Sequence, residues 1–346
     1  MPVMFFKLFA IAACLSGALC AGAFEIRDVT IPNQRDNVKL AGTLVTPADG
    51  RVRAAIVLAS GSGAQDRDET ILHHKPFKVI AESLSDKGFA VLRVDDRGVG
   101  ESTGDAASVT LNSNVRDVEA AANWLDSAFS DIPLGIIGHS EGGQIAVRLA
   151  QKDNVDFIIT LAAPAWAGDS IIMSQGRAIA TAMTGRWDGE AMQRKLLDIA
   201  KSNLPNHLAH SMMYIEMANT LGEMAKMPQV KSQLNQQIDA MLSPWYREFL
   251  RYNPAEDIKR VSKPWLALNG SKDMQVLPAN LASIKELNPS AYTLLLEGLN
   301  HLFTAAQSGS PSEYATITEP LSPTVIDAIV NWLEKILSQP SSTKTS

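Results

Sequence analysis

The sequence predicts an α/β fold in which a mostly parallel sheet is flanked by helices. Short β-branched runs alternate with helical patterns through the first half of the chain, which is the signature of such a sheet. Four of these runs are continuously apolar, as expected of strands that are buried on both faces. Residues 165–260, in contrast, are rich in Met, Gln, Asn and Ala and lack a convincing strand, so we expect a helical insertion lying over the sheet.

The insertion divides the predicted core into two parts, residues 24–164 and 261–338. The first two strands are separated by a polar segment and should form a leading hairpin. The first core helix ends at Gly88, a residue suited to the left-handed cap position. The predicted strands span residues 26–31, 39–45, 54–59, 90–94, 134–137, 157–161, 265–268 and 292–296. The predicted core helices span residues 77–87, 111–129, 141–151, 279–287 and 323–337.

The N-terminus has the pattern of an export signal. Lys7 is the only charge before an apolar run too short to span a bilayer, and Ala21-Gly22-Ala23 supplies the small residues of a cleavage site. We therefore predict that residues 1–23 are a signal peptide and that the protein is exported, to the periplasm or outside the cell. Lipid attachment at Cys14 is an alternative, disfavoured by the short apolar stretch before it. Cleavage after residue 23 would remove both cysteines and exclude disulfides.

The remaining composition is ordinary for a globular enzyme. The net charge is −6 and the 31 Lys and Arg residues are scattered, so no basic patch indicates nucleic-acid binding. The apolar runs give no reason to expect stable membrane insertion. Residues 339–346 are rich in Ser, Thr and Lys, and we expect a disordered tail. The sequence does not indicate an oligomeric state.

A serine in a glycine-rich turn is the strongest chemical signal. The run Gly138-His139-Ser140-Glu141-Gly142-Gly143 follows a buried strand and opens an amphipathic helix. Its glycines are expected where strand and helix approach too closely for side chains. Because such a turn holds a hydroxyl above the sheet, we predict that Ser140 is a nucleophile; an incidental serine in a structural turn is the alternative.

A serine hydroxyl needs a base, and that base needs an acid to orient it. His301 follows the last predicted strand and suits the base, with His73 and His74 as alternatives. Asp273 follows the strand 265–268 and suits the acid, with Asp257 and Asp169 as alternatives. His139 should support packing or the loops, because its side chain should project away from that of Ser140.

Two backbone amides are required to stabilise the oxyanion of acyl transfer. The Glu141 amide lies at the N-terminus of the predicted helix, where the helix dipole assists. The second donor should come from the run Ser60-Gly61-Ser62-Gly63, with Ser62 favoured and Gly63 next. A phosphate-binding loop is disfavoured because no Gly-Lys-Ser/Thr ending follows. The run 95–102 lacks the spacing of a dinucleotide motif, and we interpret it as a turn in which Arg97 and an aspartate tie neighbouring loops together.

These motifs resemble the α/β-hydrolase superfamily, and more narrowly its secreted bacterial esterase-like branch related to prolyl oligopeptidases and serine aminopeptidases. The resemblance covers about residues 26–337 and rests on the order Ser140, Asp273, His301, on the D-x-R-G-x-G-x-S run at 95–102, and on the insertion before the acid. Many relatives carry His-Gly where this chain has Ser60-Gly61. That departure leaves the second oxyanion donor open.

The resemblance implies a serine hydrolase that needs no cofactor and no metal. Its substrate would be a small-molecule ester with a small to medium acyl group, cleaved through an acyl-enzyme. The insertion would form a lid, with Trp245 and Tyr246 contributing to an apolar lining. A peptidase or amidase, a thioesterase or an acyltransferase of the same fold are the alternatives, and a non-catalytic binding protein on a hydrolase scaffold is the alternative from another class.

Overall fold

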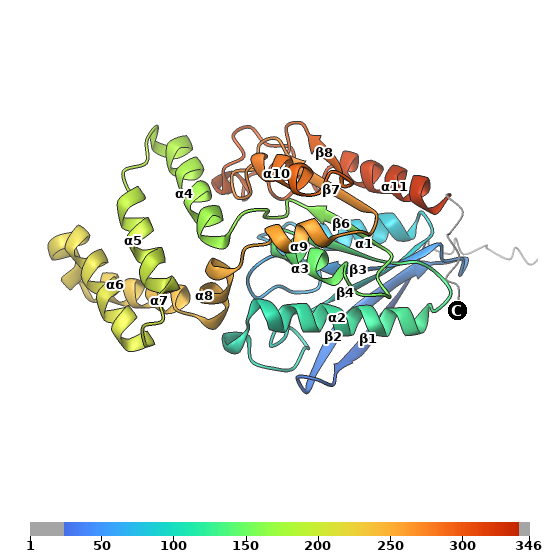
Figure 1. The fold of residues 1–346 in the computed structure, drawn as a ribbon, viewed down its shortest axis with the longest axis horizontal. Helices are drawn as coiled ribbons and strands as arrows, with labels where there is room; N and C mark the ends of the chain where they lie inside the picture. The colour runs from blue at the N-terminus through green and yellow to red at the C-terminus, as the bar shows by residue number, and fades with distance from the viewer. Residues whose placement is uncertain (1–23, 339–346) are drawn as a thin grey trace, which may run out of the picture.

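The computed structural model describes residues 24–338. The predicted signal peptide and the predicted tail, residues 339–346, lie outside the described residues. The described chain is built on an eight-stranded sheet, with a group of helices projecting beyond one end of it (Figure 1). This arrangement confirms the predicted fold class. No helix within residues 24–338 is both long and apolar enough to cross a membrane.

The sheet is antiparallel at one edge and parallel elsewhere. Its strand order is β1-β2-β4-β3-β5-β6-β7-β8. β1 pairs with β2 and β2 with β4 in antiparallel fashion, and the remaining neighbours are parallel. All predicted strands are observed, and the leading hairpin is β1-β2. The strands are β1 (Phe24–Asn33), β2 (Val38–Pro47), β3 (Ala54–Ala59), β4 (Phe89–Val94), β5 (Leu134–His139), β6 (Phe157–Leu161), β7 (Trp265–Gly270) and β8 (Tyr292–Leu296).

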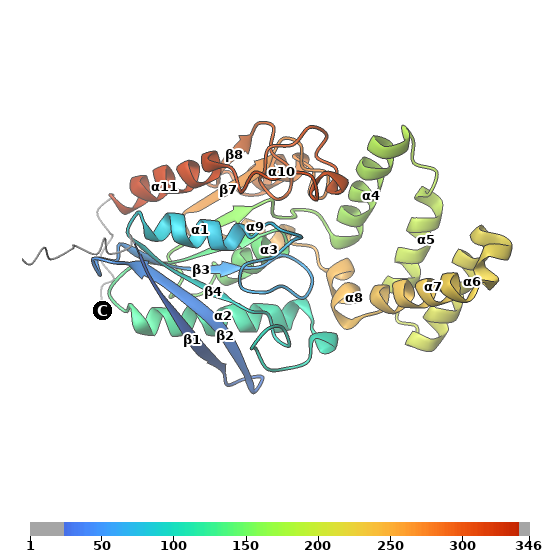
Figure 2. The same ribbon diagram turned by 180° about the vertical axis from the view of Figure 1, so that it is seen from behind.

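Helices cover both faces of the sheet, as the continuously apolar strands predict. On β3, Ile56 and Leu58 belong to one apolar cluster while Ala55 and Val57 belong to another, because successive side chains point to opposite faces. Figure 2 shows α1 in front of the sheet, and Figure 1 shows α3 and α9 on the opposite face. One face carries α1 (Pro76–Ser85) and α11 (Pro323–Leu337); the other carries α2 (Leu111–Ala128), α3 (Glu141–Leu149), α9 (Ala255–Arg260) and α10 (Ala279–Leu287).

The insertion between β6 and β7 has an apolar core of its own. Residues such as Leu197, Met213, Ile238 and Leu250 form this cluster. Its helices are α4 (Gly168–Thr184), α5 (Glu190–Lys201), α6 (Asn206–Leu221), α7 (Pro228–Met241) and α8 (Pro244–Arg251). The predicted range 165–260 also included α9, but Ile258 of α9 packs into the core beside the sheet. Helical propensity alone could not reveal this difference, which depends on the partner that each helix packs against.

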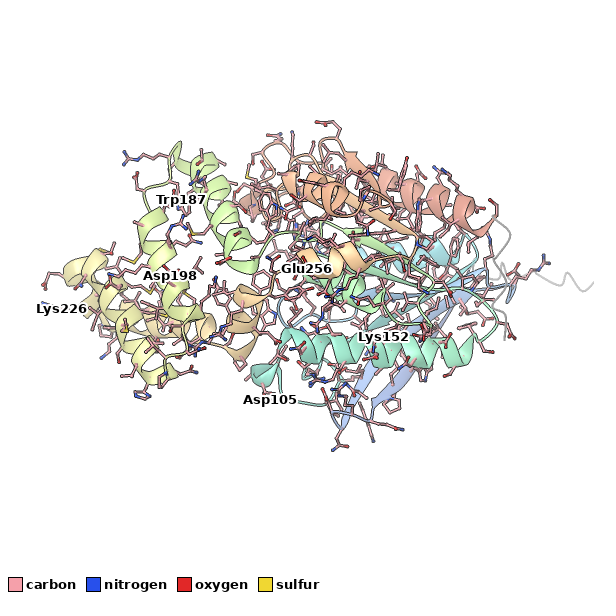
Figure 3. The ribbon with its side chains drawn as sticks, in the orientation of Figure 1. Asp105, Lys152, Trp187, Asp198, Lys226 and Glu256 are labelled. Carbon is pink, nitrogen blue, oxygen red and sulfur yellow. The ribbon has the colours of Figure 1, made fainter. Side chains whose placement is uncertain are left out.

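The insertion also contains a cavity of about 820 Å³ between α4 and α5. Trp187 and Asp198, both labelled in Figure 3, line this cavity, as do Met173 and Arg177 of α4. Ile171, Ile172 and Gln175 of the same helix line a different and smaller cavity. Helix α4 therefore separates the two spaces.

Candidate active site

Ser140 occupies a strained turn between β5 and α3. Its φ of 52° and ψ of −118° lie in a region that residues with side chains rarely adopt. The Ser140 amide donates to the Leu161 carbonyl at the end of β6, at 2.8 Å, which fixes the turn against the neighbouring strand. Such strain persists only where the surrounding structure imposes it, and it is typical of functional sites.

Close backbone packing explains the glycines around Ser140. A Cβ atom at Gly138 would lie 2.0 Å from the Gly142 carbonyl oxygen, and one at Gly142 would lie 1.9 Å from the Ala59 carbonyl oxygen. At Gly143 the added atom would lie 2.5 Å from the Ala163 side chain. The predicted reason for these glycines is therefore confirmed.

Asp273 and His301 meet at the same end of the sheet. Asp273 lies in the loop after β7 and His301 in the loop after β8, and both are buried. His301 Nδ1 lies 2.8 Å from Asp273 Oδ2. The other carboxylate oxygen, Oδ1, accepts hydrogen bonds from the backbone amides of Gln275 and Val276 at 2.8 and 2.9 Å. Because the carboxylate accepts from Nδ1, the second ring nitrogen of His301 is left for other chemistry.

Ser140 and His301 line one cavity of about 180 Å³. Within residues 24–338, no hydrogen bond joins the Ser140 hydroxyl to the His301 ring; such contacts often tighten only when substrate binds. Trp245 lines this cavity, whereas Tyr246, the other residue predicted to line it, does not. Both residues pack against the core of the insertion, but Tyr246 does not reach the cavity, because adjacent residues of a helix point in different directions.

The residues predicted as alternative bases and acids make their contacts away from Ser140. His73 and His74 contact the backbone carbonyls of Ile317 and Tyr314 at 2.6 and 3.0 Å and line a separate cavity. Asp257 accepts a hydrogen bond from the Tyr252 hydroxyl at 2.8 Å. Asp169 pairs with Lys201 on the insertion. None of these four candidates lines the cavity that contains Ser140.

The loop after β3, residues 60–68, lies against Ser140, and we call it the glycine-rich loop. A Cβ atom at Gly61 would lie 3.3 Å from the Ser140 Cβ. Ser62 lines the cavity and Gly63 does not. Within residues 24–338, the backbone amides of Ser62 and Glu141 have no hydrogen-bond acceptor. The Glu141 amide is one of the donors that every helix leaves unpaired at its first turn.

Asp96 holds this loop in place. Its Oδ1 accepts from the Ser60 hydroxyl at 2.7 Å and its Oδ2 from the Gln65 amide at 2.9 Å. Desolvation raises the pKa of Asp96 to about 7, in spite of these hydrogen bonds. The neighbouring Arg97 donates to Asp117 at 2.6 Å and to Asp36 at 2.7 Å. The run 95–102 is thus a structural turn that ties loops together, as the sequence predicts.

The Glu141 side chain connects the Ser140 turn to the insertion. It is 1% exposed and accepts hydrogen bonds from Asn114 Nδ2 at 3.1 Å and from Trp245 Nε1 of α8 at 2.6 Å. Burial raises its pKa to about 7. Sequence reasoning used only the backbone of Glu141 and missed this role, as it missed the buried carboxyl of Glu69. For Glu141, the one available signal of such a role was the position of an acidic residue directly after the predicted nucleophile.

Comparison with known proteins identifies the family. The family model described as serine aminopeptidase, S33, matches residues 51–280. The chain belongs to this family. This match contains Ser140 and Asp273 and ends before His301, so the family model itself covers two of the three predicted residues.

Named relatives of this serine aminopeptidase family member include esterases. Esterase EstD of Thermotoga maritima is 26% identical over 318 residues, which are 90% of this chain and 68% of that protein. The Pyrococcus furiosus esterase Pf2001 has a TM-score of 0.57 at 18% identity, covering 90% of this chain and 91% of the other. A Thermogutta terrifontis esterase has a TM-score of 0.53 at 19% identity, covering 90% and 100%. The structures show the α/β-hydrolase fold, and together with the family they identify this chain as a hydrolase of that superfamily.

Proposed function

We propose that the protein is a serine carboxylesterase that cleaves esters of small to medium acyl groups. The observation that carries this proposal is the Asp273–His301 contact of 2.8 Å at the wall of the cavity where Ser140 is held in a strained turn. Nucleophile, base and acid on three separate loops at one sheet edge are the arrangement that acyl transfer requires. The esterase names of the relatives support the same reaction class.

In the proposed mechanism, Ser140 Oγ attacks the carbonyl carbon while His301 Nε2 accepts its proton. The Asp273 carboxylate accepts a hydrogen bond from the Nδ1–H group of His301 and so holds the imidazole in the required tautomer. The amides of Glu141 and Ser62 stabilise the negative oxygen of the tetrahedral intermediate. His301 then passes its proton to the leaving alcohol, and a water molecule attacks the acyl-enzyme by the reverse sequence of proton transfers.

The insertion is proposed to act as the lid that limits the substrate. Trp245 and Phe249 of α8 and Ile171 and Ile172 of α4 supply apolar walls. A cavity of about 180 Å³ favours a short acyl chain over a long one. We also propose that residues 1–23 direct export, since they carry the pattern of a signal peptide.

The first experiment is a substrate panel with Ser140→Ala as its control. Wild-type protein should hydrolyse p-nitrophenyl acetate and butyrate, and Ser140→Ala should lose about 10⁶-fold in kcat. Near-wild-type activity of Ser140→Ala would refute the assignment of the nucleophile. Aminoacyl p-nitroanilides belong in the panel, because the family description favours a peptidase as the second candidate. Faster hydrolysis of anilides than of esters would decide for that candidate.

Matched variants test the base and the acid. Asp273→Asn should lower kcat by about 10⁴-fold, because an amide cannot hold the required tautomer of the histidine. Asp257→Asn should leave turnover unchanged. His301→Gln should abolish turnover, and His74→Gln, at one of the alternative histidines, should retain it. The opposite result in either pair would assign the role to the alternative residue.

A further inference from the structure

A buried carboxylate lies between the glycine-rich loop and His139, the residue directly before Ser140. Glu69 is 1% exposed, and its Oε1 accepts a hydrogen bond from the Gly61 amide at 2.6 Å. The same oxygen contacts His139 Nδ1 at 2.9 Å. Glu69 therefore joins the loop proposed to hold the oxyanion to the residue directly before Ser140.

His139 extends this connection to His301. Its Nε2 lies 2.9 Å from the backbone carbonyl oxygen of His301, and the two imidazole rings lie with their centroids 4.7 Å apart. A carbonyl oxygen can only accept, so Nε2 must carry a hydrogen and donate it. With Nε2 donating and Nδ1 facing a carboxylate, the geometry is that of an imidazolium bound to Glu69.

Electrostatics agrees with this protonation state. Burial lowers the pKa of His139, but the negative charge and hydrogen bond of Glu69, with the His301 carbonyl and the charge of Asp273, together leave the pKa above its ordinary value. The pair is enclosed, because His139 is 5% exposed. Two opposite charges held in such surroundings keep their partners in a fixed geometry.

Glu69 also carries costs that a purely structural residue would avoid. It has a positive φ of 52°, which is unfavourable for a residue with a side chain. Its second oxygen, Oε2, is buried and has no hydrogen-bond partner within residues 24–338. Both features lie at the cavity that contains Ser140, since Glu69 and His139 line it. Strain and an unsatisfied polar atom retained at one residue are typical of functional positions.

We propose that Glu69 and His139 are positioning residues that hold the oxyanion donor and the catalytic histidine in register around Ser140. This inference rests on the proposed function. Through Gly61, Glu69 sets the direction of the next amide, which belongs to Ser62. Through the His301 carbonyl, His139 sets the position of the backbone that carries the base. The pair acts on both sides of the nucleophile without touching the substrate's reacting atoms.

The proposal predicts a loss that is specific to the transition state. A misplaced oxyanion donor lowers kcat by about 10²-fold and leaves ground-state binding nearly unchanged. Glu69→Gln and His139→Gln should each lower kcat by about that factor with KM within about threefold of wild type. Because the two residues act as one unit, the double variant should be no slower than the slower single variant.

The experiment measures kcat per active site on p-nitrophenyl acetate, with sites counted by the end point of fluorophosphonate labelling. A trifluoromethyl ketone, which mimics the tetrahedral intermediate, supplies the second readout: its inhibition constant should rise in proportion to the fall in kcat/KM. Asp117→Asn is the matched control, because it breaks a buried ion pair with Arg97 away from the cavity. It should lower stability and leave kcat per active site unchanged.

The outcomes separate this proposal from the function on which it rests. Wild-type protein without ester hydrolysis would refute the proposed function itself. If wild type is active and both single variants keep wild-type kcat per labelled site, the positioning role is refuted and the esterase assignment stands. Multiplicative losses in the double variant would also overturn the proposal, because they would show two independent roles. If Glu69→Gln does not fold, His139→Gln alone provides the same kcat and inhibitor readouts.

Discussion

The side chain of Glu141 should make the stability of the fold depend on pH, and Glu141→Gln should remove the part of this dependence that Glu141 contributes. Glu141 is 1% exposed at the start of α3, where burial raises its pKa from an ordinary value of 4.5 to about 7. Its hydrogen bonds from Asn114 and Trp245 favour the charged form but do not offset burial. The folded protein therefore holds a proton that the unfolded chain releases between about pH 4.5 and 7.

The sign and size of the effect follow from this difference in proton binding. Where the folded state binds more protons than the unfolded state, the free energy of unfolding falls as pH rises. The fall runs from about pH 4.5 to about pH 7 and then stops, since both states are ionised above it. A pKa raised from 4.5 to about 7 corresponds to about 3 kcal/mol at the high-pH plateau.

Glu141→Gln keeps the shape of the site and removes the ionisation. The new amide oxygen can accept from Trp245, and Asn114 can turn its own amide so that its oxygen accepts from the new NH₂ group. The variant should therefore be about 3 kcal/mol more stable than wild type at pH 8.5 and nearly equal to it at pH 4.5.

Urea unfolding of both proteins across this pH range provides the measurement. Glu223→Gln is the control, because the Glu223 side chain is 86% exposed and its replacement should give no pH-dependent difference. A stability difference between wild type and Glu141→Gln that does not change with pH would refute the reasoning. So would a wild type that is the more stable protein at pH 8.5.

Three further predictions concern packing, ion pairing and substrate size. Gly142→Ala places a Cβ atom 1.9 Å from a carbonyl oxygen of β3 and should lower the free energy of unfolding by at least about 1 to 3 kcal/mol, the usual cost of overpacking a core. Gly189→Ala, whose added Cβ atom has its nearest neighbour at 3.4 Å, should be tolerated in the same thermal unfolding assay. Arg97→Met removes the ion-pair partner that the carboxylates of Asp36 and Asp117 share. It should lower the free energy of unfolding in urea by about 3–5 kcal/mol without changing kcat per active site. Trp245→Ala should enlarge the cavity of about 180 Å³ and shift the preferred p-nitrophenyl ester to a longer acyl chain, whereas Tyr246→Ala should not.

The fold was readable from the sequence because its signals are local. Continuous apolar runs such as 54–59 and 134–137 are expected to be buried on both faces, and a turn residue such as Gly88 favours the end of a helix. The order of the strands, in which β4 lies between β2 and β3, depends on pairing across the sheet. The end of the insertion depends similarly on what α9 packs against. Neither can be derived from a local pattern.

The site shows the same division. The turn around Ser140 was predictable because its glycines are adjacent in sequence, and Asp273 and His301 follow the ends of strands. The roles of the Glu69 and Glu141 side chains could not be found this way, because each contacts its partner across a large separation: 70 residues for the Glu69–His139 contact and 104 for the Trp245–Glu141 contact. A residue that supports another residue has no motif of its own.

The buried carboxyl groups around Ser140 fix the position of the neighbouring loops. Glu69 and Asp96 both hold the glycine-rich loop, and Glu141 holds the insertion through α8. Desolvation raises the pKa of Asp96 and of Glu141 to about 7, so the ionised form of each weakens the fold near neutral pH. Apolar side chains in these places would remove that penalty, but they could not accept the hydrogen bonds that fix both loops. We infer that loop position, at the expense of stability, determines which residues surround the proposed nucleophile.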